Sequence, residues 1–127
     1  MSGWLIALGL LSFGLARVHV LAGGKECARP LLDADLGRIP KLTLYACWHY
    51  VSLHLALGGV ALVWIGARPV LMGNAIAAVV ASTWLGFAAV FLAIIPRARV
   101  RGAWFRLGQW MAFLPMGIAG LAVALGG

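Results

Sequence analysis

The chain has 127 residues, of which 64% are hydrophobic and only 10% are charged, and its formal net charge at neutral pH is +7. So little polar surface cannot cover a soluble core, and the mean hydropathy of +1.02 instead predicts a membrane protein. The basic charge needs no nucleic acid as a partner, because it is expected at one membrane face beside anionic lipid headgroups.

A membrane-spanning helix needs about 20 mostly apolar residues, and four segments of the sequence meet this requirement. They cover residues of about 2–22, 42–66, 70–95 and 104–126. We therefore expect an all-α fold in which residues 1–127 form a single transmembrane domain, a four-helix bundle with connecting loops at 23–41 and 96–104.

The first span and the loop after it carry His19 and Glu26, seven residues apart. Residues at this spacing share one face of a helix, provided that the helix continues through Gly23-Gly24. We expect these glycines to loosen the end of the helix, so that the loop begins there.

The second span begins with CWHYVSLH, residues 47–54, which places His49 and His54 in an apolar segment. Five residues correspond to about 140° around a helix, so the two imidazoles cannot both point at one small ligand. Antiparallel packing of the first two spans brings His49 to the depth of His19 and Glu26, with His54 nearer the midplane.

Ionisable side chains inside membrane spans are usually tied to function. Two imidazoles and a carboxylate are sufficient ligands for a divalent metal such as zinc or iron, so the candidate metal ligands are His19, Glu26, His49 and His54. The same histidines suit hydrogen bonds between helices equally well. Haem held by His19 with His49 or His54 is a weaker candidate, because such ligation needs a large flat pocket that the sequence does not indicate.

The third span has small or polar residues at every fourth position, namely Asn74, Ala78, Ser82 and Gly86. Small residues let a second backbone approach closely. We expect this seam to join helices, and we expect the chain to form a homo-oligomer or to dock onto a partner membrane complex.

The segment PRARVRGAWFR, residues 96–106, combines two aromatic residues with four arginines, Arg97, Arg99, Arg101 and Arg106. It predicts an interfacial anchor whose arginines face anionic lipid headgroups. Most basic residues lie here and in 23–41, whereas neither tail is charged. The positive-inside rule therefore predicts that both loops are cytoplasmic and that both termini lie on the non-cytoplasmic side.

His19, the segment GGKECARPLL at 23–32 and the pair Trp48-His49 together resemble a group of small, uncharacterised four-helix membrane proteins of bacteria. The resemblance covers the first half of the chain. It implies a bacterial inner-membrane location and four spans, and it implies no particular activity.

These observations predict a small multi-pass inner-membrane protein with a histidine-centred site that binds or transports a metal ion or protons. Two alternatives remain open: a non-catalytic structural or accessory subunit of a larger membrane complex, and a haem-binding electron-transfer subunit. An enzyme is not favoured, because the spans contain no nucleophile beside a base, no glycine-rich phosphate loop and no paired carboxylates.

Overall fold

The computed structural model describes residues 2–68 and 70–126, and every regular element in this part of the chain is helical. In chain order the elements are α1 (Gly3–Val18), the π-helix η1 (His19–Ala28), α2 (Arg29–Asp33), α3 (Arg38–Ala67), α4 (Gly73–Ile94), the 3-10 helix η2 (Ile95–Arg97), α5 (Ala103–Arg106) and α6 (Trp110–Gly126). The all-α prediction is confirmed. Within these described residues, three continuous helices are long and apolar enough to cross a membrane: Gly3–Asp33, Arg38–Ala67 and Gly73–Arg97.

The chain, predicted above as one domain, falls into two compact units. Residues 6–64 form one unit, called here the histidine unit, and residues 1–5 with 65–127 form the other, called the C-terminal unit. Each is described by itself.

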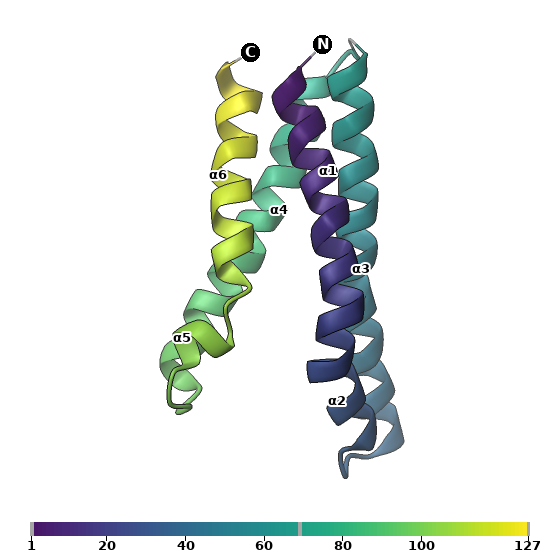
Figure 1. Ribbon diagram of the computed structural model, residues 1–127, viewed down its shortest axis with the longest axis vertical. Helices are drawn as coiled ribbons and strands as arrows, with labels where there is room; N and C mark the ends of the chain where they lie inside the picture. Colours follow the sequence, from purple (N-terminus) through teal and green to yellow (C-terminus); the bar gives the residue numbers. More distant parts are fainter. Residues whose placement is uncertain (1, 69, 127) are drawn as a thin grey trace. The chain divides into compact units, whose positions relative to one another are not determined.

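In the histidine unit, α1 and α3 lie side by side and run antiparallel (Figure 1). A Cβ atom added to Gly9 would lie 2.8 Å from the carbonyl oxygen of Gly59, so the two backbones approach each other closely at this point. One turn further along α1, the fully buried Ser12 hydroxyl donates a 2.7 Å hydrogen bond to the carbonyl of Leu55. The antiparallel packing expected for the first two spans is therefore present.

The first helix does not end at Gly23-Gly24. It continues through η1, whose end is marked by a bond from the Arg29 amide to the Gly24 carbonyl, five residues earlier. Trp48 covers both glycines, since a Cβ on Gly23 would lie 3.7 Å from its indole. The expected loop of 23–41 is consequently mostly helical, and only residues 34–37 separate the two long helices.

In the C-terminal unit, α4 and α6 pack against each other (Figure 1). Gly117 of α6 lies against Ala81 and Leu85 of α4, and the rings of Phe87 and Phe113 meet edge to face with centroids 5.3 Å apart. The buried residues of α4 are Ala77, Val80, Ala81, Trp84 and Ala88.

This buried stripe of α4 is not the seam predicted from the small residues. Ser82 and Gly86 are exposed, and a Cβ on Gly86 would meet nothing within 4 Å. The larger side chain of Trp84 is buried instead, so burial along α4 does not follow residue size.

The fourth predicted span, 104–126, is interrupted. The short helix α5 ends where Leu107 leaves helical geometry, with φ −106° and ψ 47°, and α6 begins three residues later with 17 residues. The Trp110 indole Nε1 donates a 3.1 Å hydrogen bond to the Trp104 carbonyl across this break. The fourth segment is thus a shorter apolar helix than the three long ones.

Candidate functional site

His19, the first residue of η1, is held against α3 by two contacts with Trp48. Its ring stacks on the indole with centroids 4.5 Å apart and planes 20° apart, and its Nε2 lies 3.2 Å from the Trp48 carbonyl oxygen. A carbonyl only accepts hydrogen bonds, so Nε2 is the donor and carries the hydrogen, while Nδ1 carries the lone pair of the neutral ring. These contacts fix both the orientation and the tautomer of the imidazole.

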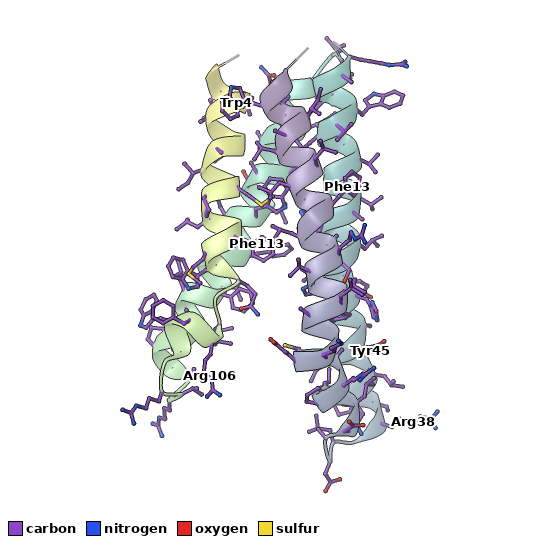
Figure 2. The ribbon with its side chains drawn as sticks, viewed as in Figure 1. Trp4, Phe13, Arg38, Tyr45, Arg106 and Phe113 are labelled. Carbon is purple, nitrogen blue, oxygen red and sulfur yellow. The ribbon has the colours of Figure 1, made fainter. Side chains whose placement is uncertain are left out.

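His49 follows Trp48 in α3 and contacts two aromatic neighbours. Its ring meets Trp48 edge to face with centroids 4.9 Å apart, and it meets Tyr45, one turn earlier, in the same way at 4.5 Å. Figure 2 shows Tyr45 toward the end of the helix pair where Arg38 also lies. The indole of Trp48 therefore contacts both imidazoles, and we call His19, Tyr45, Trp48 and His49 the aromatic cluster.

Two hollows of the histidine unit adjoin this cluster. The larger has a volume of about 760 Å³ and is lined by Ala16, Arg17, Val20, Leu21, His49, Tyr50, Ser52, Leu53 and Ala56. The smaller has a volume of about 310 Å³ and is lined by Val20, Leu21, Gly24, Lys25, Ala28, Arg29, Tyr45, Trp48 and His49. Val20, Leu21 and His49 line both hollows, which therefore adjoin, and the two together are called here the groove.

The groove is apolar along its length and basic on one side. Arg17 lines the larger hollow, and Lys25 and Arg29 line the smaller one. No carboxylate belongs to the lining of either hollow. The groove therefore suits ligands that carry negative charge and apolar surface together.

Two of the four residues predicted as metal ligands come together in the aromatic cluster. His19 and His49 both contact Trp48, whereas Glu26 is exposed on η1 and His54 lies about 8 Å further along α3. Neither Glu26 nor His54 lines the groove. Across residues 2–68 and 70–126, no three His, Cys, Asp or Glu side chains are grouped closely enough to hold a metal ion.

The bis-histidine haem interpretation has little geometric support here. Bis-histidine ligation needs the two imidazoles on opposite sides of a large flat group, whereas His19 and His49 both contact the Trp48 indole. The Nε2 atom of His19 is also engaged by the Trp48 carbonyl.

Trp48 lies at the centre of the site, a role that was not predicted from its sequence. Two signals point to it in retrospect. Tyr45 lies three residues before it on the same helical face, and the adjacent glycines at 23 and 24 leave room for an indole on the neighbouring helix. The π-helical geometry of η1 has no comparable signal in the sequence, although π-helical turns frequently occur at functional sites.

The four arginines predicted to face lipid headgroups are all exposed: Arg97, Arg99, Arg101 and Arg106. The Arg97 guanidinium donates a 2.7 Å hydrogen bond to the Ala93 carbonyl at the end of α4. Arg106 lies on α5, at one end of the C-terminal unit (Figure 2).

Comparison with protein-family models, with curated proteins and with solved structures gives no match to this chain.

Proposed function

We propose that this chain is a small multi-pass protein of a bacterial inner membrane whose aromatic cluster binds and exchanges protons through His19 and His49. The observation that carries the proposal is the contact of both imidazoles with one indole, that of Trp48, inside two long apolar helices. Histidine is the side chain whose charge changes near neutral pH. Ionisable residues in membrane spans are commonly parts of proton relays.

Protons are favoured over a metal ion because only two suitable ligands, His19 and His49, meet in the cluster. A stable metal site needs at least three protein ligands in most cases, and the described residues do not bring three together. The charged and titratable groups that line the groove around His49 are Arg17, Lys25, Arg29, Tyr45 and Tyr50.

The proposal is tested with the full chain in lipid nanodiscs, with its three histidines isotopically labelled and assigned through single His→Gln variants. Imidazole chemical shifts are followed by NMR between about pH 5 and 8. The imidazole shifts of His19 should change with pH, and His49→Gln should move the titration midpoint of His19, since neighbouring sites titrate together. His54→Gln is the matched control and should leave that midpoint unchanged.

Two results contradict the proposal. The first is a titration midpoint of His19 that His49→Gln leaves unchanged. The second is a stoichiometric metal ion, found by elemental analysis of the purified protein and lost in both His19→Gln and His49→Gln, which would establish the metal interpretation instead.

A second candidate function is that of a subunit that docks onto another copy or onto a partner complex through α4. It is favoured by the exposed Ser82 and Gly86, which lie off the stripe buried in the C-terminal unit. Crosslinking in native membranes should then yield a discrete larger species that Gly86→Leu weakens. A monomer under the same conditions would exclude it.

A further inference from the structure

Arg17 is the one charged residue between Gly3 and Gly24 in the sequence. It lies on α1, within a helix that is apolar enough to cross a membrane. A guanidinium in such a span is costly unless an anion or water compensates its charge. The lining of the hollow beside Arg17 contains no carboxylate to fill that role.

The remainder of the larger hollow is suited to a hydrocarbon chain. Val20, Leu21, Leu53 and Ala56 give it an apolar wall from both helices. The volume of about 760 Å³ lies in the range of pockets that hold small organic ligands.

The smaller hollow continues from this wall toward the end of the helix pair and adds the cations of Lys25 and Arg29. Cationic side chains along one side of an apolar groove match the structure of a phospholipid, which joins an anionic phosphate to acyl chains. A free anion would not use the apolar wall, and an uncharged lipid would not use the cations.

We propose that the groove of the histidine unit binds one membrane phospholipid with a net negative headgroup. The phosphate lies among Arg17, Lys25 and Arg29, and an acyl chain follows Leu21, Leu53 and Ala56. This ligand is different from the proton exchange proposed above, and its binding does not depend on it.

The experiment uses the full chain, purified in detergent and stripped of lipid, with phosphatidylglycerol as the probe and the zwitterionic phosphatidylcholine, whose net charge is zero, as the comparison. Native mass spectrometry counts the bound lipids over a concentration series. We expect one phosphatidylglycerol to bind in preference to phosphatidylcholine. Arg17→Gln, and the pair Lys25→Gln with Arg29→Gln, should each weaken this binding by about tenfold, the effect expected from loss of a charge-assisted hydrogen bond.

Matched controls come from basic residues outside the groove. Arg38→Gln and Lys41→Gln remove charge from the same unit, and neither residue lines the groove. They should change the affinity for phosphatidylglycerol by less than about twofold. Equal losses in these controls would show that only net charge attracts the lipid, and would overturn the proposal.

A second variant tests the apolar wall without changing any charge. Ala56→Phe places a ring in the larger hollow and should weaken phosphatidylglycerol binding, while far-UV circular dichroism and gel filtration report whether the chain is folded. Arg17→Lys should retain more binding than Arg17→Gln, so the charge is also tested if the Gln variant fails to fold.

Unchanged lipid binding in Ala56→Phe, or equal competition by inorganic phosphate, would mean that no acyl chain occupies the groove. Neither outcome would affect the histidine titrations, so the two proposals fail separately.

Discussion

His19 stacks on the indole of Trp48 with centroids 4.5 Å apart, and the Nε2 of His19 donates a hydrogen bond to the main-chain carbonyl of Trp48. One contact uses the Trp48 side chain and the other uses its backbone. A substitution at residue 48 therefore removes the stack and leaves the hydrogen bond, so the two contributions can be measured separately.

A double-mutant cycle on His19→Ala and Trp48→Ala should give a coupling free energy of about 0.5–1.5 kcal/mol, the range for stacked aromatic rings. The measurement is the free energy of unfolding in mixed micelles as the denaturing detergent is increased. The matched control cycle pairs His19→Ala with Phe13→Ala, because Phe13 packs beside Gly59 instead. The control effects should add to within about 0.5 kcal/mol, and equal coupling in both cycles would refute a specific stack.

Gly9→Ala should destabilise the histidine unit. The new Cβ would lie 2.8 Å from the Gly59 carbonyl oxygen and from a Val63 methyl, so the helices must move apart, at a cost of about 1–3 kcal/mol. Gly14→Ala is the control on the same helix, because its Cβ would meet nothing within 4 Å. The free energy of unfolding should fall for the first variant and stay level or rise slightly for the second. Equal effects would contradict the close approach of α1 and α3.

Ser12→Ala removes the hydrogen bond between α1 and the Leu55 carbonyl. We expect a loss of about 0.5–2 kcal/mol, the range for side-chain hydrogen bonds between helices in membranes. Thr43→Ala is its matched control, because the Thr43 hydroxyl bonds to Ile39 within its own helix and is exposed. That variant should change the unfolding free energy by less than about 0.5 kcal/mol; a larger loss than in Ser12→Ala would contradict the interhelical role.

Gly117→Ala should loosen the packing of α6 on α4, because the added Cβ would lie 2.6 Å from two atoms of the Leu85 side chain. The expected destabilisation is about 1–3 kcal/mol. Adding Leu85→Ala to the same chain should recover part of it by removing the clashing atoms. Recovery stays incomplete because the Ala81 carbonyl oxygen would still lie 3.1 Å away.

Gly86→Ala is the control for Gly117→Ala within the C-terminal unit, since a Cβ at residue 86 meets open space. It should leave the unfolding free energy within about 0.5 kcal/mol of the original value. If Leu85→Ala fails to improve Gly117→Ala, the contact between residues 85 and 117 is not the cause of the loss.

The sequence by itself determined the all-helical class and the three longest apolar helices, because these follow from composition and from the length of uninterrupted apolar runs. It also singled out His19 and His49, since a histidine in an apolar helix stands out from its neighbours. Antiparallel packing of the first two spans then brings them to similar depth.

Tertiary structure decided the rest. The helix continues through Gly23-Gly24 because Trp48 packs over these glycines and the π-helical turns keep the backbone bonded, and neither effect is local to the sequence around residue 23. Glu26 lies outside the cluster. It follows His19 by seven residues, which is about two turns of an α-helix but not of the wider π-helix η1, so the two side chains do not share a face. The buried stripe of α4 contains Ala81 and Trp84 rather than the small-residue seam, because a helix buries the face that its neighbours cover and not the face with the smallest residues.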